Sequence, residues 1–156
     1  MNEVSSTEPA NEDPLALENQ VCFALVVASR SLIALYRPIL EPLGLSHPQY
    51  LVMLALWQHA PLSVKELSGL LQLEAATLSP LLKRLEAADL VRRDRRVEDE
   101  RQLAVTLTPA GRELRTLAEA VPHQVVERLG LGFDELRGLN VVLNRVIAAA
   151  AGRDSD

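Results

Sequence analysis

Residues 74–108 read EAATLSPLLKRLEAADLVRRDRRVEDERQLAVTLT, and this stretch decides the fold. In its first half, four leucines have the spacing of a helix that buries one stripe of side chains: Leu78, Leu81, Leu82 and Leu85. The period then changes, because residues 90–93 (LVRR) and 103–107 (LAVTL) fit two short strands joined by the charged run 94–102. A helix followed by a charged hairpin is typical of a winged helix-turn-helix.

The opposite face of this predicted helix offers small polar and basic side chains: Thr77, Ser79, Lys83 and Arg84. Such a helix can enter the major groove of DNA and present these groups to base edges, while the hairpin reaches the backbone or the minor groove. Residues 83–101 hold seven of the sixteen basic residues of the chain, but six acidic residues share the same segment. Charge alone therefore does not separate a DNA-binding hairpin from a solvated one.

The composition suits a single domain with a substantial core, since the chain has 156 residues and 48% of them are hydrophobic. The net charge of −5 comes from residues 1–29, which contain five acidic residues and no Lys or Arg. We find no apolar run of membrane-spanning length and no signal-like start, so we expect a cytoplasmic protein without a membrane partner. The single cysteine excludes an intrachain disulfide and a Cys-rich zinc site.

The helical patterns predict a mainly α fold with a small β-hairpin wing and six helices. The first begins at the Asp13-Pro14 cap, and Pro38, Pro42 and Gly44 end it. The other five are 48–59 with Ser46 as N-cap, 63–70 with a Ser63–Glu66 capping box, the helix of Leu78, 109–129 with a kink at Pro122, and a last helix capped by Asp134.

These elements predict three kinds of segment. Residues 1–13 are polar and acidic and form an arm with little to bury. Residues 46–108 form the DNA-binding winged helix-turn-helix. The apolar helices of 14–45 and 109–151 lie outside that unit and need mutual burial, which a two-fold dimer would supply.

The order of elements, the Asp99-Glu100-Arg101 segment and the restart at 107–111 (LTPAG) resemble the MarR (multiple antibiotic resistance regulator) family of winged-helix repressors, over roughly residues 15–150. Three stretches resemble its organic hydroperoxide resistance regulator branch: 22–25 (CFAL), 48–54 (PQYLVML) and 77–86 (TLSPLLKRLE). Pro80 is distinctive in the last, because a proline inside a helix is costly beyond the first turn.

The resemblance implies a homodimer on a pseudo-palindromic operator in double-stranded DNA, with a reading helix in each major groove and a wing in each minor groove. By this resemblance Thr77, Ser79 and Lys83 lie on the reading face, and Asp99 orients Arg101 in the minor groove. The remaining candidate DNA-binding residues are Pro80, Arg84, Arg95 and Arg96. An Asp99–Arg101 ion pair that only stiffens the hairpin is the alternative.

The resemblance assigns the sensing of organic hydroperoxides to Cys22. A sensor cysteine needs hydrogen-bond donors or positive charge nearby, because the thiolate is the reactive form. We expect Cys22 to lie about eight residues into its helix, too deep for the helix dipole to help. The alternative is a small buried hydrophobic residue.

In this branch tyrosine hydroxyls supply the donors, and Tyr36 stands at the matching position. Tyr36 follows Cys22 by fourteen residues, about 21 Å along a straight helix, so the two can meet only between antiparallel helices of two chains. Val26 and His47 stand where related sensors carry tyrosine, although His47 can also donate a hydrogen bond and, when protonated, would favour a thiolate. Otherwise Tyr36 is an amphipathic helix-end residue and His47 a turn residue.

If Cys22 senses peroxide, it becomes a sulfenic acid, and a small-molecule thiol must resolve it because the chain has no second cysteine. The mixed disulfide would then release the operator. Two other functions remain open: a regulator that binds a small aromatic acid with Cys22 inert, and a one-cysteine thiol peroxidase. No phosphate loop, carboxylate pair or metal-spaced histidines support an enzyme, and His47, His59 and His123 are scattered, so we expect no enzyme activity, cofactor or metal.

Overall fold

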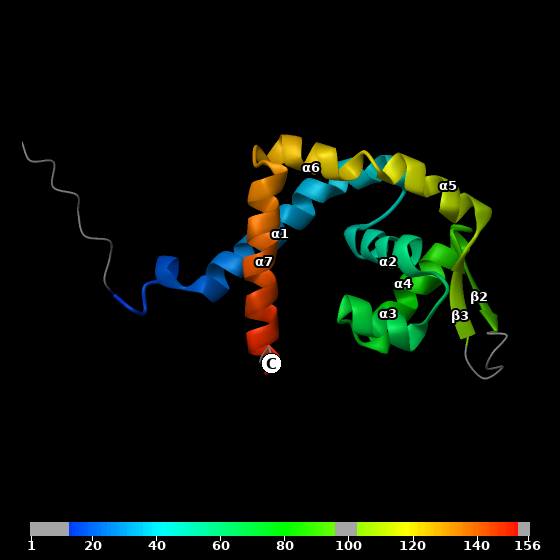
Figure 1. Ribbon diagram of the computed structural model, residues 1–156, viewed down its shortest axis with the longest axis horizontal. Helices are drawn as coiled ribbons and strands as arrows, with labels where there is room; N and C mark the ends of the chain where they lie inside the picture. Colours follow the sequence, from blue (N-terminus) through cyan, green and yellow to red (C-terminus); the bar gives the residue numbers. More distant parts are fainter. Residues whose placement is uncertain (1–12, 96–102, 153–156) are drawn as a thin grey trace, which may run out of the picture.

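The computed structural model describes residues 13–95 and 103–152 (Figure 1). Its α-helices are α1 (Val21–Leu40), α2 (His47–His59), α3 (Val64–Leu71), α4 (Ala75–Ala87), α5 (Pro109–Ala118), α6 (Val121–Leu129) and α7 (Phe133–Ala150). The strands are β1 (Leu62–Ser63), β2 (Val91–Arg95) and β3 (Leu103–Leu107), and two short 3-10 helices are η1 (Leu17–Asn19) and η2 (Glu41–Leu43). The predicted fold class, mainly α with a small β wing, is confirmed.

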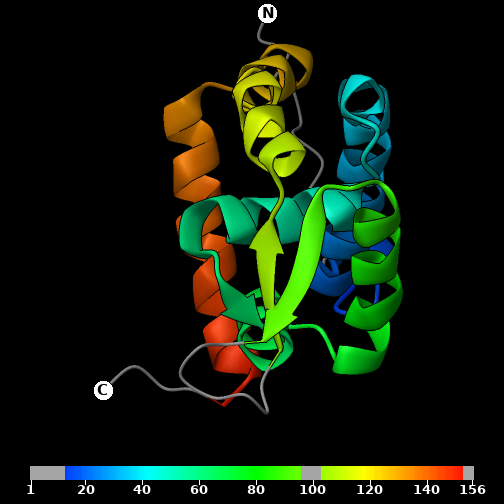
Figure 2. The same cartoon turned by 90° about the vertical axis from the view of Figure 1, so that its right-hand side faces the viewer.

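Most of the core lies in the head, which we define as α2, α3, α4 and the three strands (Figure 2), and the C-terminal end of α1 and the helix α6 also contribute to it. The leucine stripe predicted for α4 is confirmed, since all four members are buried: Leu78, Leu81, Leu82 and Leu85. They pack in one cluster with Val52, Met53 and Leu56 of α2 and Leu67 of α3. Burial of this stripe fixes α4 with its other face toward solvent.

The wing is an antiparallel sheet in the order β1-β3-β2. The two strands of the hairpin were predicted, and their register pairs Val91 with Leu107 and Arg93 with Val105. The sequence did not indicate β1, because two residues are too few to show an alternating pattern. This strand joins the segment before α3 to the sheet, so the β2–β3 hairpin is attached to the helices of the head.

Serine caps begin α2 and α3, as predicted. The Ser46 side chain accepts a hydrogen bond from the Gln49 amide, and the Gln49 side chain accepts one from the Ser46 amide. The Ser63–Glu66 pair forms the same reciprocal box at the start of α3. Each box satisfies two amides that have no partner within the helix, which sharpens the helix start.

The first helix begins later than predicted. Asp13 accepts a hydrogen bond from the Leu15 amide, as a cap would, but the chain then forms only the short η1 helix. Gln20 is extended, and α1 starts at Val21. Pro38 lies inside α1 rather than ending it, and Gly44, in the left-handed region with φ of 68°, terminates η2.

The helix predicted over 109–129 is divided into α5 and α6. Pro122 occupies the first turn of α6, where its missing N–H costs nothing. In a continuous helix Pro122 would instead remove a bond to the Ala118 carbonyl and crowd it, so the helix ends and restarts. The expected kink is therefore a break at residues 119–120.

The outer helices leave much apolar surface exposed. In Figure 1 the N-terminal part of α1 projects away from the head, and α7 descends from the end of α6 apart from α2, α3 and α4. No residue of α7 is buried, and the exposed apolar side chains on these two helices include Phe23, Val26, Ile33, Leu139, Val142 and Ile147. The described chain alone does not enclose these helices.

The segment Val21–Leu43 has the length and composition of a membrane span, with a mean hydropathy of 1.5 and only 11% of its most apolar part buried. The expectation that the chain holds no such run is therefore wrong. A helix that is apolar over most of its surface is enclosed either by lipid or by other protein. Length and composition alone do not choose between these two surroundings.

Close packing and three hydrogen bonds join the head to the start of α5. The Thr108 amide donates to the Leu90 carbonyl, and the Thr108 hydroxyl accepts from the Gly111 amide as the N-cap of α5. The carbonyl of Gly111 accepts a 2.9 Å hydrogen bond from Trp57 Nε1 of α2. A Cβ at Gly111 would overlap the backbone oxygen of Leu90, so only glycine allows this approach.

We expect Gly111→Ala to destabilise the fold by about 1–3 kcal/mol, because the added methyl meets backbone that cannot move aside cheaply. Chemical denaturation followed by circular dichroism measures the change. Gly69→Ala is the matched control, since Gly69 lies in α3 with open space around it. That control should be neutral or stabilising by up to about 1 kcal/mol. Equal free energies of unfolding for the two variants would contradict the close approach.

Candidate functional site

The solvent face of α4 carries the residues predicted to read DNA. Thr77, Lys83 and Arg84 are exposed, and Ser79 is half-buried, on the side away from the four buried leucines. Pro80 is exposed in the second turn of α4, where it cannot donate to the Ala76 carbonyl. The helix therefore presents a short polar and basic surface whose orientation is set by the core beneath it.

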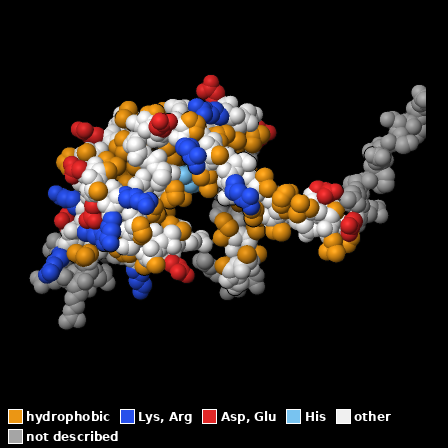
Figure 3. Space-filling model, turned by 180° about the vertical axis from the view of Figure 1, so that it is seen from behind, with side chains coloured by type: hydrophobic (Ala, Val, Ile, Leu, Met, Phe, Trp, Pro, Cys, Tyr) orange, Lys and Arg blue, Asp and Glu red, His pale blue; other side chains and the backbone are white. Residues whose placement is uncertain are grey.

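The wing extends this basic surface. Arg95 is the last residue of β2 and is exposed, whereas the predicted residues Arg96, Asp99 and Arg101 lie outside the described residues. Arg92 forms an exposed ion pair with Asp94 at 3.6 Å. Figure 3 shows several Lys and Arg side chains at the wing end of the molecule, with acidic side chains among them and further basic side chains over the rest of the body, while the projecting N-terminal part is hydrophobic and acidic.

A link between α4 and the wing was missed by the sequence analysis. Arg93 of β2 lies with Nε 3.3 Å from Glu86 Oε2 near the end of α4. The pair is close enough for an ionic interaction but is not aligned as a hydrogen bond, since Arg93 Nε has no such partner within the described residues. Only the observation that both charges flank a predicted helix-to-strand turn could have suggested it.

Cys22 is exposed and is the second residue of α1. The expectation that it lies about eight residues into a helix is therefore wrong, because the preceding residues form η1 and an extended Gln20. Cys22 instead lies in the first turn, where backbone amides lack partners within the helix and negative charge is favoured. It is not a buried hydrophobic residue in the single chain.

Tyr36 belongs to the same helix, fourteen residues further along. The corresponding separation of about 21 Å along the axis rules out contact with Cys22 within one chain. Tyr36 instead contacts His47 of α2, with ring centroids 5.0 Å apart and planes at 63°. The structure thus brings two of the three predicted sensing residues together and leaves the cysteine apart.

Tyr50 completes this aromatic cluster and was not predicted as a site residue. Its ring centroid lies 5.9 Å from that of Tyr36, and only 4% of the residue is exposed. His47 and Tyr50 are three residues apart at the start of α2 and so share a face, which is the signal that could have identified the pair.

Burial shifts the pKa of all three side chains in this cluster. It raises the pKa of Tyr36 and lowers that of His47. Burial, with a further contribution from the nearby Tyr36, raises the pKa of Tyr50 to about 12. At neutral pH both phenols therefore keep their protons and can donate hydrogen bonds, and His47 is held in its neutral form.

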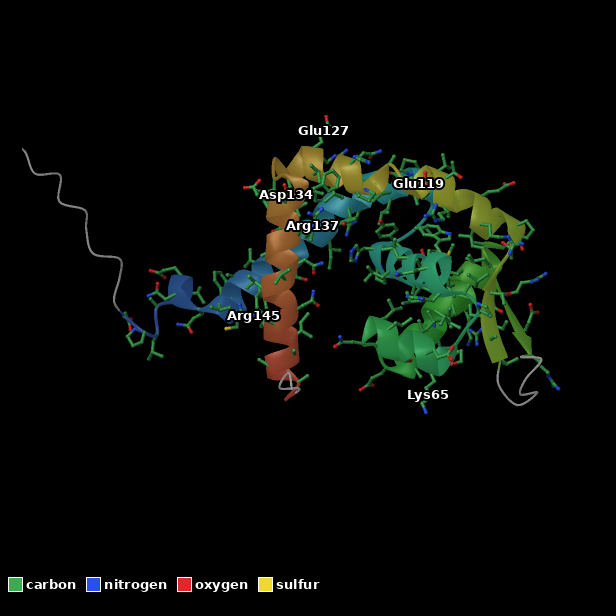
Figure 4. The ribbon with its side chains drawn as sticks, in the orientation of Figure 1. Lys65, Glu119, Glu127, Asp134, Arg137 and Arg145 are labelled. Carbon is green, nitrogen blue, oxygen red and sulfur yellow. The ribbon has the colours of Figure 1, made fainter. Side chains whose placement is uncertain are left out.

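A pocket of about 460 Å³ lies between α2 and the α5–α6 region. Tyr50, Leu54, Trp57, Ala118 and Pro122 form most of its lining. Arg115 also lines it and pairs with Glu119 at 2.6 Å; Figure 4 labels Glu119 on this side of the molecule. Residues 13–95 and 103–152 contain no cluster of His, Cys, Asp and Glu that would hold a metal ion.

The chain is similar to known transcriptional regulators. The sequence model of the SarA/Rot transcriptional regulators matches residues 34–116. TtmR, an HTH-type transcriptional regulator of Methylorubrum extorquens, is 44% identical over 133 residues, which are 85% of this chain and 68% of that protein. The organic hydroperoxide resistance transcriptional regulator of Bacillus subtilis is 38% identical over 131 residues, 84% of this chain and 89% of its own.

A solved structure of a similar protein contains DNA. Reduced AbfR bound to DNA has 34% sequence identity and a TM-score of 0.69, and the match covers 86% of this chain and 94% of that one. AbfR is a protein of Staphylococcus epidermidis. Together with the winged head, these similarities show a DNA-binding transcriptional regulator and not an enzyme. The chain belongs to the MarR/SarA family of winged-helix transcriptional regulators.

Proposed function

We propose that the protein is a homodimeric repressor that releases its operator when an organic hydroperoxide oxidises Cys22. The observation that carries this proposal is the placement of an exposed Cys22 at one end of α1 and an aromatic cluster at the other. The similar regulator of Bacillus subtilis is named for organic hydroperoxide resistance, which supports the same effector class here.

DNA binding is assigned to α4 and the wing. The exposed face of α4 enters the major groove, with Thr77, Ser79 and Lys83 toward base edges and Pro80 and Arg84 beside them. Arg95 places positive charge at the start of the wing, and the sequence adds Arg96, Asp99 and Arg101 beyond it. The similar AbfR structure contains DNA, which supports this use of the fold.

A second copy of the chain covers the exposed faces of α1 and α7. A membrane is a poor alternative partner, because Arg30 lies near the middle of Val21–Leu43 and a charged side chain at the bilayer centre costs about 2.5 kcal/mol or more. A dimer instead leaves arginine at the edge of an interface. We therefore assign residues 14–45 and 109–151 to dimerisation and place this regulator in the cytoplasm, with the DNA.

Cys22 and Tyr36 meet across this dimer. The phenols of the aromatic cluster stay protonated and can donate to the Cys22 thiolate of the partner, and the first turn of α1 adds unpaired amides. Neutral His47 packs against Tyr36 and is a further donor. The site is complete only when two chains combine.

The redox step balances with an external thiol. The thiolate sulfur attacks the outer oxygen of the hydroperoxide, the O–O bond breaks, and the alcohol leaves after taking a proton while Cys22 becomes a sulfenic acid. A small-molecule thiol then forms an S–S bond with Cys22, and water leaves. The added group pushes α1 helices apart, which moves the two α4 helices away from the spacing of about 34–36 Å that matches one turn of DNA.

A second candidate effector is a small aromatic acid. The pocket beside Tyr50 and Trp57 offers aromatic walls, and Arg115, which pairs with Glu119 in the single chain, would exchange that partner for the carboxylate of the ligand. A ligand in this pocket would contact both α2 and the α5–α6 region and could shift α5 relative to the head without involving Cys22.

We expect an organic hydroperoxide with added low-molecular-weight thiol to release wild-type protein from its operator and to leave Cys22→Ser bound. A gel-shift titration measures the fraction of operator DNA bound by each protein under the same conditions. Equal release of the two would contradict sensing by Cys22. Release of both by a phenolic acid, with no response to peroxide, would establish the aromatic-acid function instead.

We expect Lys83→Ala to weaken operator binding by about 1–3 kcal/mol, because a side chain of the reading face loses its contact with DNA. Arg137→Ala is the control, since Arg137 is exposed on α7 away from α4 (Figure 4). Affinities are measured by gel shift at fixed salt. The assignment of α4 fails if both variants bind like wild type or weaken equally.

We expect the two tyrosines of the chain to titrate above their usual pKa of 10.0, Tyr50 near 12. Because the folded state holds these protons more tightly than the unfolded state, their contribution to stability is complete below pH 10 and is lost as the pH rises through the folded pKa values. Ultraviolet absorbance of tyrosinate and denaturation at each pH measure both effects. Tyr50→Phe should remove the latest-titrating phenol; an unshifted titration in wild type would contradict the buried cluster.

A further inference from the structure

We propose that Glu86 and Arg93 are positioning residues for operator binding, because their ion pair sets the angle between α4 and the wing. The proposal rests on the assignment of α4 and the wing to DNA given above and names the contact that makes the two act together. Glu86 is the next-to-last residue of α4, and Arg93 is the central residue of β2. The pair therefore joins the helix assigned to the major groove to a strand of the wing.

The head covers the wing only as far as Arg93. Val91 and Leu107 pair at the base of the hairpin, and both are buried. Arg95 and Leu103 pair at the far end of the described strands, and both are exposed. Arg93 lies between these two pairs and is the last residue of β2 that is partly covered. A contact at Arg93 restrains the outer part of the strands more directly than the contacts at the base do.

The guanidinium of Arg93 is held against the head. Strand alternation puts Arg93 on the same side of β2 as the buried Val91, whereas Arg92 and Asp94 point to the other side and pair with each other. The Arg93 side chain is 23% exposed, and its Nε and Nη2 atoms are buried without a hydrogen-bond partner among the described residues. Buried donors without partners cost free energy. The carboxylate of Glu86, with Oε2 3.3 Å from Nε, offsets part of this cost.

Loss of the Glu86 charge should therefore move the wing and leave the fold intact. A partly exposed ion pair adds little to folding stability, and α4 stays anchored by its four buried leucines. With glutamine at position 86, Arg93 would turn toward water, where its donors are satisfied. The outer strands would then lose their link to α4, so the wing would contribute less to binding while α4 keeps its contacts.

Gel-shift affinities of full-length proteins test this role, on a duplex that the wild-type protein selects from random sequences. Lys83→Ala reports on α4 and Arg95→Ala on the wing, and in wild type each should weaken binding about fivefold or more. In a Glu86→Gln background we expect the Arg95→Ala effect to fall below about twofold while the Lys83→Ala effect is unchanged. Asp94→Asn is the matched control background, since it also removes one carboxylate but breaks only contacts on the other side of β2. In that background both effects should equal those in wild type.

The double variant Glu86→Arg with Arg93→Glu rebuilds the pair in reverse and should restore the Arg95→Ala effect. Circular dichroism melting checks that each variant is folded, and absence of recovery in a folded double variant would overturn the pairing. An undiminished Arg95→Ala effect in Glu86→Gln would overturn the positioning role and leave the assignment to DNA intact. Equal loss of both effects would also overturn it, because that is the pattern of general loosening. If neither Lys83→Ala nor Arg95→Ala weakens binding in wild type, the assignment of α4 and the wing to DNA itself fails.

Discussion

The close approach of Gly111 to Leu90 is the constraint on which the arrangement of the molecule depends. Leu90 ends the turn after α4, and Gly111 lies in the first turn of α5, the helix that leads to α6 and α7. Thr108 is hydrogen-bonded to both Leu90 and Gly111, and Trp57 of α2 donates a hydrogen bond to the Gly111 carbonyl. Helix α4, the wing and α5 therefore meet at one joint, through which a displacement of α5 would act on α4.

The outer helices have the opposite character. The head buries all four leucines of the α4 stripe, whereas no residue of α7 is buried and the N-terminal part of α1 projects away from the head. Apolar surface of this extent is normally covered by a partner. The same feature explains why a membrane-span composition and a dimer interface coincide in one helix. Both need apolar side chains over much of the helix surface, and they differ in how they accommodate a central arginine.

Local signals in the sequence predicted the head well. The leucine stripe of α4 and the serine boxes of α2 and α3 depend on residues close together in the chain, so spacing alone identified them. The start of α1 was misplaced because Asp13-Pro14 is a good cap, yet the chain after it forms only η1. The break before Pro122 was read as a kink, because a proline position alone does not say whether the helix continues. Contacts between different elements were missed, among them Tyr36 with Tyr50 and Glu86 with Arg93, because neither pair has a periodic signature.

The position of Trp57 has a practical consequence. It is the single tryptophan of the chain, and its indole N–H is bonded to the Gly111 carbonyl at the joint between the head and α5. Its emission spectrum depends on that hydrogen bond and on the water around the ring, so the protein carries an intrinsic optical reporter of whether this joint is closed. Changes that reach the head from the outer helices can thus be followed in real time without an attached label.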